Sequence, residues 1–490
     1  MLPNQNPATR TQKLPENIWF LGIGGIGMSA LARWFRAGGH RVGGYDRTPT
    51  PLTKALEAEG ITVIFDEAVA ALPTWVSADP AAVLIVRTPA VPTGHAQWQY
   101  FQTQGYAIRK RSEVLGMLTA GTRLIAVAGT HGKTTTSSMV AHLLHHAGVP
   151  VAAFLGGIAT NFSSNLLLPT GAAEAASGPS GNSPLLTVVE ADEYDRSFLT
   201  LYPTVAIVTS TDADHLDIYG DKAALLDSFR DFVGQIQPYG LLLLNYTADE
   251  RVLAKLDPTV QVIRYGLVGG VAEDADADAR ALRVAGRTFT FDFSSPFGRV
   301  AALELRVPGF HNVENMVAAL TVAQHAGVGE EHLRAAVPAY AGVKRRFEFV
   351  YEDARTVYVD DYAHHPREID AFLRSLRALY PDRRLTVVFQ PHLFSRTRDF
   401  ATGSGESLSL ADEVVLLPIY PAREEPMLGV TSALIFAAVT APTKVLLAHK
   451  QDLLEFLATA AGRPAVLATV GAGDIDTLVE PVRQWLANST

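Results

Sequence analysis

The chain has 490 residues, more than one hydrophobic core usually serves, so its length predicts about two to four domains. A content of 48% hydrophobic and 19% charged residues is typical of a globular protein, and the absence of cysteine excludes disulfides and thiolate metal sites. The net charge of -9, with no long basic run, argues against nucleic acid as a partner.

The N-terminal segment predicts neither export nor membrane insertion. A polar, proline-containing lead runs directly into a short apolar pattern, with no apolar stretch long enough for a signal peptide. No later stretch approaches the roughly 18–20 uninterrupted apolar residues of a membrane span. We therefore expect a cytoplasmic protein, whose oligomeric state the sequence leaves open.

Short apolar runs rich in Val, Ile and Leu recur between longer amphipathic segments. Such runs are typical of strands buried on both faces, and the helical stretches between them predict an α/β class with parallel sheets. Examples of the predicted strands are 18–23, 81–86, 124–128, 185–190, 205–209, 240–244, 386–390 and 414–418. Two turn-rich or acidic segments, 169–184 and 273–280, are predicted to be mobile surface loops.

Three glycine-marked junctions between a strand and a helix predict three α/β domains. They lie at residues 22–27, at residues 129–136 and near Gly342. We place the domain boundaries near residues 120 and 342, which gives domains of residues 1–120, 121–342 and 343–490.

The first junction carries the pattern G-x-G-x-x-G at Gly22, Gly24 and Gly27. It follows a predicted strand and opens a predicted helix, and Asp46 ends the next strand. This context indicates a dinucleotide-type fold that cradles a diphosphate at a helix N-terminus. The pattern does not say which nucleotide carries the diphosphate.

The second junction, GTHGKTTT at residues 129–136, carries the strongest local signal. Its glycines let backbone N–H groups point inward around phosphates, and Lys133 can reach the outer phosphates. The hydroxyl of Thr134 can ligate Mg²⁺. The junction predicts binding of ATP with Mg²⁺, although the first glycine of the standard loop would fall at Val127.

Two predicted strands end in clusters of carboxylates. One runs into Glu190 and three further acidic residues, and the other runs into Asp214, His215 and Asp217. A carboxylate at a strand end beside a phosphate loop usually holds Mg²⁺, and a neutral His can supply a second ligand. Glu190 and His215 are therefore the predicted metal ligands.

The segment PGFHNVEN places Asn312 and Asn315 on one face of an incipient helix. Either Asn312 caps this helix, or both amides recognise the edges of adenine or ribose. The segment VKRRFE at 343–348 follows, and an Arg delivered from it can neutralise a transferring γ-phosphate.

Two late clusters, DDYAHHP at 360–366 and FQPHLFSRTR at 389–398, each follow an apolar run. Each is therefore expected at the carboxyl end of a strand, where α/β domains place ligand contacts.

Nearly the whole chain resembles the Mur ligase family of peptidoglycan synthesis. The motifs that carry the resemblance occur in this order: GIGGIGMSALA, GTHGKTTT, VVEADEYDRSFL, DADHLDIYG, PGFHNVENMVAA, GVKRRFE, DDYAHHPREI, FQPHLFSRTRDF and VGAGDI. The combination of GTHGKTTT with the two late clusters is specific for the muramate branch of the family. The resemblance implies a Rossmann-like UDP-binding domain, a central P-loop-type ATPase domain and a C-terminal Rossmann-like domain.

The resemblance also implies roles for matching residues. Lys133, Glu190, His215 and Arg346 would be catalytic, and Thr134, Glu190 and His215 would hold Mg²⁺. The residues expected to bind ATP are Gly129, Thr130, His131, Gly132, Lys133, Thr134, Thr135, Asn312, Asn315, Arg346 and Asp361. Those expected to bind UDP-N-acetylmuramate are Gly22, Gly24, Gly25, Ile26, Gly27, Asp46, Thr88, Thr160 and Asn161. Tyr362, His364 and Arg396 would shape the amino-acid pocket.

The implied reaction is amide formation between the lactyl carboxylate of UDP-N-acetylmuramate and L-alanine, through an acyl phosphate made with ATP. Closure of the third domain on the second is the expected gate, because the acyl phosphate needs a dry site. One departure concerns the amino acid. Many relatives have Arg after the PH of FQPH, where this chain has Leu393. If that Arg helps hold the carboxylate of the amino acid, Arg396, Arg398 or another group must compensate in this chain.

Three alternatives remain open. The nearest is the related recycling ligase that attaches a preformed murein tripeptide to UDP-N-acetylmuramate. An NAD-dependent oxidoreductase would use the N-terminal glycines but leave the GKT loop and both acidic strand ends without a role. A non-catalytic ATP-binding regulator would need the phosphate loop alone.

Overall fold

The structure is a computed structural model that describes residues 14–169, 185–214, 216–267, 275–422, 424–459 and 463–488. The chain divides into two compact units. The first contains Met1–Gly266, Gly270–Ala277 and Ala318–Ala336, and the second contains Leu267–Gly269, Asp278–Val317 and Val337–Thr490. The domain boundaries near residues 120 and 342 stay predictions. No helix in the described ranges has the length and apolar character needed to cross a bilayer.

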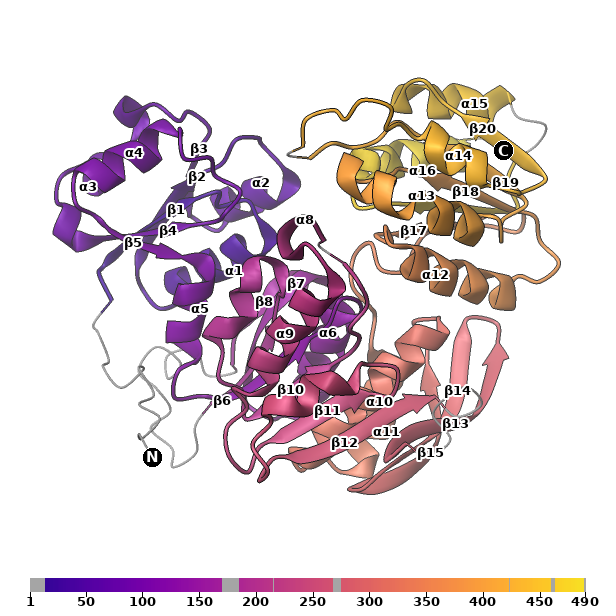
Figure 1. Cartoon of the computed structure of the whole chain (residues 1–490), viewed down its shortest axis with the longest axis horizontal. Helices are drawn as coiled ribbons and strands as arrows, with labels where there is room; N and C mark the ends of the chain where they lie inside the picture. The colour runs from indigo at the N-terminus through magenta and orange to yellow at the C-terminus, as the bar shows by residue number, and fades with distance from the viewer. Residues whose placement is uncertain are drawn as a thin grey trace. The chain divides into compact units, whose positions relative to one another are not determined.

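The first unit begins with a five-stranded parallel sheet in the order β3-β2-β1-β4-β5 (Figure 1). Its strands are β1 (Asn17–Leu21), β2 (Arg41–Tyr45), β3 (Thr62–Ile64), β4 (Val83–Arg87) and β5 (Ala107–Lys110). The helices between them are α1 (Ile26–Ala37), α2 (Pro51–Ala58), α3 (Thr74–Ser77), α4 (Ala96–Thr103) and α5 (Arg111–Thr119). The strand order reverses between β1 and β4, which is where open α/β sheets bind ligands.

Alternate side chains of β1 enter two cores, because successive residues of a strand face opposite sides of the sheet. Ile18 and Phe20 join the cluster that contains Phe35 of α1. Trp19 and Leu21 join the cluster that contains Phe101 of α4. Helices therefore cover both faces, as the continuous apolar run predicted.

The strands of the first unit's central sheet lie in the order β12-β11-β10-β6-β9-β7-β8. Neighbouring strands from β11 to β7 in this order are parallel, and β8 is antiparallel to β7. Its strands are β6 (Arg123–Ala128), β7 (Val151–Ala159), β8 (Ser164–Leu167), β9 (Leu186–Glu190), β10 (Val205–Val208), β11 (Leu241–Asn245) and β12 (Gln261–Leu267). The main helices are α6 (Lys133–His146), α8 (Leu216–Tyr219) and α9 (Lys222–Val233). This arrangement brings the carboxyl ends of β6, β9 and β10 to one edge.

The second unit contains an antiparallel ladder of β13 (Ala277–Ala285), β14 (Thr288–Ser295) and β15 (Gly298–Leu305). The prediction of a mobile loop at 273–280 is wrong from residue 277 onward, because Ala277, Asp278 and Ala279 are buried in β13. Arg280 pairs with the Asp278 carboxylate at 2.7 Å, which makes burial of that acid tolerable. The other predicted loop lies outside the described residues from position 170 onward.

A six-stranded sheet in the order β16-β17-β21-β18-β19-β20 completes the second unit, with only β16 antiparallel. The strands are β16 (Glu348–Glu352), β17 (Val357–Asp361), β18 (Leu385–Phe389), β19 (Glu413–Leu416), β20 (Thr443–Leu446) and β21 (Val466–Val470). The helices that lie wholly in this unit are α12 (Pro366–Leu379), α13 (Phe394–Leu408), α14 (Ala433–Ala438), α15 (Leu453–Thr459) and α16 (Val479–Asn488). Two further helices, α10 (Phe310–His325) and α11 (Glu330–Ala339), have residues in both units. The sheets confirm the predicted α/β class.

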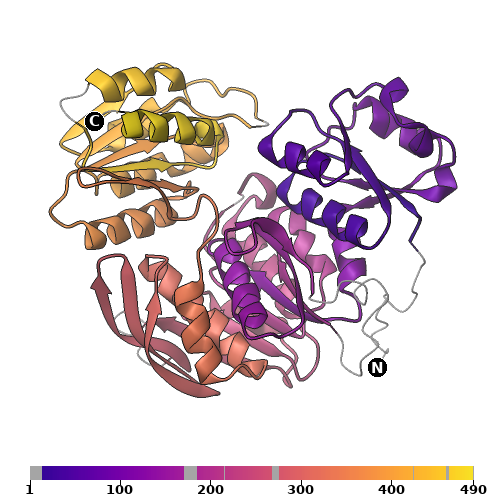
Figure 2. The same cartoon turned by 180° about the vertical axis from the view of Figure 1, so that it is seen from behind.

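Both faces of this last sheet are also covered. Val387 and Phe389 of β18 pack with Phe372 of α12, whereas Val388 packs on the other side with Leu486 of α16. Figure 2 shows helices of the C-terminal yellow segment over the second face. Polar side chains that follow these strands therefore collect at the sheet edge.

Asn165 of β8 fixes helix α1 to the central sheet within the first unit. Its amide nitrogen donates to the Ser29 hydroxyl at 2.9 Å and to the Ile26 carbonyl, and its oxygen accepts from Arg33. The side chain is fully buried. No sequence motif pointed to this residue.

We expect Asn165→Ala to lower the free energy of unfolding by about 2 kcal/mol, because it leaves buried groups of α1 without their partners. Denaturant unfolding of the purified chain measures the change. Asn161→Ala, at an exposed turn position, is the control and should change it by less than about 0.5 kcal/mol. An equal effect of the two changes would contradict the assigned role of Asn165.

Candidate functional site

The phosphate loop connects β6 to α6 and has the backbone conformation that its glycines allow. Gly129 has a φ of +134° and Gly132 a φ of +79°, both in the range that favours glycine. A side-chain carbon at Gly129 would lie 2.0 Å from the Thr209 hydroxyl oxygen. Lys133 then begins α6, as predicted, and Thr134 and Thr135 follow as buried residues.

The ammonium of Lys133 is held on its own loop and by a neighbouring acid. It donates to the carbonyl oxygens of Gly129 at 2.7 Å and Thr130 at 3.4 Å, and to Glu193 at 2.9 Å. Burial by itself would lower the Lys133 pKa, but the negative charges of Glu193, Asp192 and Glu190 outweigh it and raise the pKa. Lys133 is therefore a fixed cation at neutral pH.

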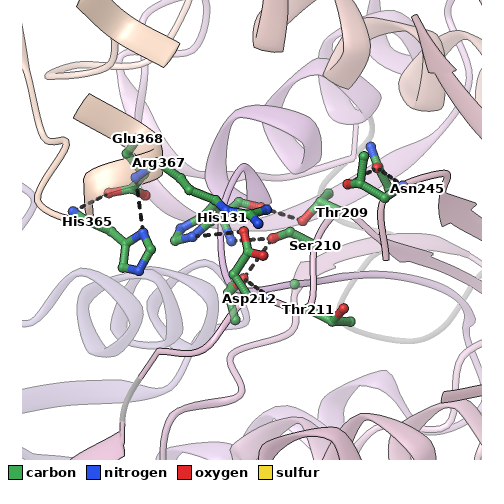
Figure 3. Close-up of polar contacts among 12 residues, drawn as sticks. His131, Thr209, Ser210, Thr211, Asp212, Asn245, His365, Arg367 and Glu368 are labelled. Atoms are coloured by element: carbon green, nitrogen blue, oxygen red, sulfur yellow. Dashed lines mark hydrogen bonds and ion pairs between the residues drawn. The ribbon is translucent and has the colours of Figure 1, made fainter. Parts of the chain in front are cut away.

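The segment that follows β10, residues 209–212, contacts the phosphate loop through polar groups (Figure 3). The Ser210 hydroxyl accepts from the His131 N–H at 2.8 Å and lies 2.8 Å from the Thr130 hydroxyl. Asp212 lies 3.6 Å from the His131 ring. Backbone and hydroxyl groups of this segment thus fix the predicted residues Thr130 and His131 in place.

Glu190 lies at the end of β9, beside the neighbouring strand β7. Its carboxylate accepts from the Gly156 N–H at 3.1 Å, and it is close enough to Lys133 to raise the Lys133 pKa. A side-chain carbon at Gly156 would lie 2.1 Å from the Glu190 carboxylate, so any larger residue there would force Glu190 to move. Thr134 and Glu190 offer the hard oxygen atoms that Mg²⁺ prefers.

His215, the third predicted metal ligand, lies outside the described residues. Among the residues that are described, no group of three or more His, Asp or Glu side chains is arranged to hold a metal ion. The metal-ligand roles of Thr134, Glu190 and His215 therefore stay predictions.

The glycine loop of the first sheet is braced by two predicted residues. Gly22 has a φ of +85° and lies against Thr88, whose methyl carbon is 2.6 Å from the position of an added side-chain carbon. The Asp46 carboxylate accepts from the Gly24 N–H at 2.7 Å. Gly25 precedes α1, and Ile26 and Gly27 form its first turn. The other two predicted residues, Thr160 and Asn161, are exposed in the turn after β7.

Helix α10 begins at Phe310, directly after Gly309, whose φ is +120°. Asn312 therefore lies inside the helix, so the interpretation of Asn312 as the helix cap is wrong. Its amide donates back to the Pro308 carbonyl at 2.6 Å. Asn312 and Asn315 are both buried in the second unit, and their role toward a nucleotide stays a prediction.

The predicted amino-acid residues gather at the carboxyl edge of the last sheet. The Arg346 guanidinium lies 4.9 Å from the centre of the Tyr362 ring, which is 5.6 Å from the His364 ring. His392 continues the row, because its ring is 6.0 Å from His364 and its Nδ1 is 3.4 Å from Arg396. Arg346, Tyr362, His364 and Arg396 thus lie in one row, and His392 connects Arg396 to the other three. The sequence did not predict the role of His392.

Leu393, where this chain departs from many relatives, is buried and has a φ of 67°. It precedes α13 and points no charged group at the cluster. Arg396 is 8% exposed beside His392, whereas Arg398 pairs with Asp399 on the surface. Arg396 is therefore the better placed of the two candidates for a carboxylate.

Asp361 organises the segment that carries Arg346. Its carboxylate accepts from the Phe347 N–H at 2.7 Å and the Ala363 N–H at 2.8 Å. Arg345 and Phe347, on either side of Arg346, have left-handed φ angles of 60° and 50°. Burial raises the pKa of Asp361 to about 6, although Arg346 and the two backbone donors oppose the increase.

Because the folded-state pKa of Asp361 is raised, its protonation stabilises the fold at low pH. This contribution is fully present below the usual carboxyl pKa near 4 and is lost as the pH rises through about 6. In Asp361→Asn we expect this fall, on the order of 2–3 kcal/mol, to disappear from the pH dependence of unfolding. Denaturant titrations between pH 4 and 7 measure the difference in slope. The same slope in both proteins would show that the pKa of Asp361 is not raised in the folded state.

Four residues of the first unit take part in this arrangement without having been predicted: Gly156, Glu193, Ser210 and Arg111. Glu193 belongs to the acidic cluster that follows the predicted strand 185–190, so the sequence could have predicted its contact with the lysine of the phosphate loop. Arg111 begins α5, and its Nη2 lies 3.3 Å from Asp192. Gly156 and Ser210 carry no sequence signal of their own.

Comparisons with known proteins cover almost the full chain. The model of the Mur ligase family, catalytic domain, matches residues 17–123, the Mur ligase middle domain matches 127–323, and the Mur ligase, glutamate ligase domain, matches 345–473. These matches confirm the predicted three-domain class. A UDP-N-acetylmuramate–L-alanine ligase of Porphyromonas gingivalis is 47% identical over 474 residues, which cover 96% of this chain and 99% of the relative. The ligase of the same name from Cytophaga hutchinsonii is 42% identical over 96% of each chain.

Two solved structures are similar along nearly their whole length. The UDP-N-acetylmuramate-alanine ligase of Thermotoga maritima has a TM-score of 0.77 and 25% identity, covering 97% of this chain and 100% of its own. A murein peptide ligase of Psychrobacter arcticus has a TM-score of 0.69 and 27% identity, covering 96% and 99%.

Proposed function

This chain belongs to the Mur ligase family, and we propose that it is the member that joins UDP-N-acetylmuramate to L-alanine with the free energy of ATP. The observation that carries the proposal is similarity along the full length to relatives with that activity in their names. ATP use is a property of the family. The tripeptide ligase, the oxidoreductase and the regulator are not favoured, because the relatives with 42–47% identity are alanine ligases.

The first step transfers the γ-phosphoryl group of ATP to the lactyl carboxylate and releases ADP. Lys133 and the backbone N–H groups of residues 129–134 bind the phosphates, whose charge must be neutralised during transfer. Thr134, Glu190 and His215 would hold Mg²⁺, which neutralises further charge on the phosphates when bound. Arg346 adds a cation for the transferring group.

The second step forms the amide, as the amine of alanine attacks the acyl phosphate and inorganic phosphate leaves. Tyr362, His364 and Arg396 orient the amino acid, and Arg396 takes its carboxylate in place of the Arg that Leu393 replaces. A buried guanidinium beside His392 suits this role, because desolvation strengthens its attraction for a carboxylate. We place the reaction in the cytoplasm, where ATP is available.

The test is an assay of phosphate release by the purified chain with ATP, Mg²⁺ and UDP-N-acetylmuramate. L-Alanine and the murein tripeptide are supplied in parallel, and mass spectrometry identifies the amide. We expect product with L-alanine. Product with the tripeptide alone would replace the proposed function by that of the recycling ligase, and no product with any amine would overturn ligase activity.

A further inference from the structure

Arg111 lines a small cavity between the first glycine loop and the end of β9, all within the first unit. The cavity has a volume of about 90 Å³. Its lining includes Gly27 and Gly156 and the charged side chains of Arg111, Glu190 and Asp192. Among the described residues that line it, Arg111 is the one cation. An acidic ligand entering beside two carboxylates therefore needs this guanidinium.

The position of Arg111 is set from two sides. Its Nη1 would lie 2.2 Å from a side-chain carbon at Gly27, so the guanidinium rests directly on the first turn of α1. Its Nη2 lies 3.3 Å from the Asp192 carboxylate. A guanidinium has five N–H donors, and this long contact uses one edge of it. Asp192 thus orients Arg111 without saturating it.

We infer that Arg111 binds an oxyanion of the acid substrate, either its diphosphate or its lactyl carboxylate, an inference that rests on the proposed function. The planar guanidinium matches either group in a bidentate geometry. The N-terminus of α1 adds partial positive charge on the same side. Glu190 lines the same cavity, so a substrate held by Arg111 reaches toward the predicted metal ligand.

Asp192 and Glu193 are consecutive residues that contact two different cations. Asp192 holds Arg111, and Glu193 holds Lys133 of the phosphate loop. The turn that follows β9 therefore orients both Arg111, on the side of the acid substrate, and Lys133, on the side of ATP. Arg111 is the substrate-binding residue of this pair of contacts, and Asp192 is its positioning residue.

The test is steady-state kinetics of Arg111→Met. We expect the KM for UDP-N-acetylmuramate to rise about 10- to 100-fold, because a charge-assisted hydrogen bond to the substrate is lost. The KM values for ATP and L-alanine should stay within about twofold. Arg111→Lys should recover part of the affinity, since a point charge replaces the fork. Arg109→Met, an exposed position on β5, is the matched control and should change nothing.

Calorimetric binding separates the two oxyanions. UDP-N-acetylglucosamine has the same diphosphate but no lactyl carboxylate, so weaker binding of both ligands to Arg111→Met assigns the diphosphate. Weaker binding of UDP-N-acetylmuramate alone assigns the carboxylate. Unchanged binding of both would overturn the inference. If Arg111→Met does not fold, Arg111→Lys gives the same decision, with an unchanged KM as the contrary result. The two proposals can fail separately. If the chain makes no product with L-alanine but Arg111→Met still weakens binding of UDP-N-acetylmuramate, the proposed function is wrong and the role of Arg111 stands.

Discussion

Replacing Lys133 by alanine should lower ATP-dependent phosphate release by about 10³-fold or more. Lys133 begins the helix after the phosphate loop, and its ammonium is charged because Glu193, Asp192 and Glu190 raise its pKa. The variant removes the cation that we propose binds the phosphates. It also removes the ion pair between Lys133 and the fully buried Glu193, which predicts a loss of stability of about 3–5 kcal/mol.

Two variants separate these effects. Lys133→Ala combined with Glu193→Gln removes the buried negative charge, so it should unfold at a higher temperature than Lys133→Ala while remaining inactive. Lys133→Arg keeps a positive charge at the loop and should retain more activity than Lys133→Ala. Phosphate release within tenfold of the wild type in a folded Lys133→Ala would show that the loop works without this lysine.

Gly156→Ala should lower kcat by about 10²-fold and raise the Mg²⁺ concentration needed for half-maximal activity. The added carbon would lie 2.1 Å from the Glu190 carboxylate oxygen and 2.4 Å from its carbon, so Glu190 must move. The shift would displace the carboxylate that we expect to hold Mg²⁺. Activity measured over a range of Mg²⁺ concentrations reports the change.

Two further variants test this explanation. Gly329→Ala is the control, since nothing lies within 4 Å of its added carbon. Glu190→Asp in the Gly156→Ala background shortens the acid by one methylene and should recover part of the activity. An unchanged Mg²⁺ requirement in Gly156→Ala would remove Glu190 from the metal site.

The sequence predicted the strands and the phosphate loop well, because both depend on local patterns. Continuous apolar runs required burial on both faces, and β6 and β9 lie where those runs predicted. The glycines of the loop specify positive φ angles at fixed positions. Carboxylates at strand ends followed from the same logic, so Glu190 lies beside the loop as expected.

The partners of these groups could not be predicted, because they depend on strand order and on turns. Gly156 meets Glu190 only because β7 pairs with β9. Glu193, rather than its acidic neighbours, contacts Lys133 because the chain turns after β9. Asn312 was misplaced by a few residues, since Gly309 lets α10 begin earlier than the amide pattern suggested.

The left-handed residues around Arg346 impose a trade-off on this chain. Such conformations cost on the order of 1–3 kcal/mol each in residues other than glycine. Glycine would relieve the cost, yet at position 345 it would remove the guanidinium that contacts Asp360, and at position 347 it would empty part of the core. Either replacement is therefore expected to lower the free energy of unfolding, because the loss of the buried contact outweighs the relief of strain. Arg345→Gly is expected to unfold at a lower denaturant concentration than the wild type, although glycine adopts a φ of 60° without strain.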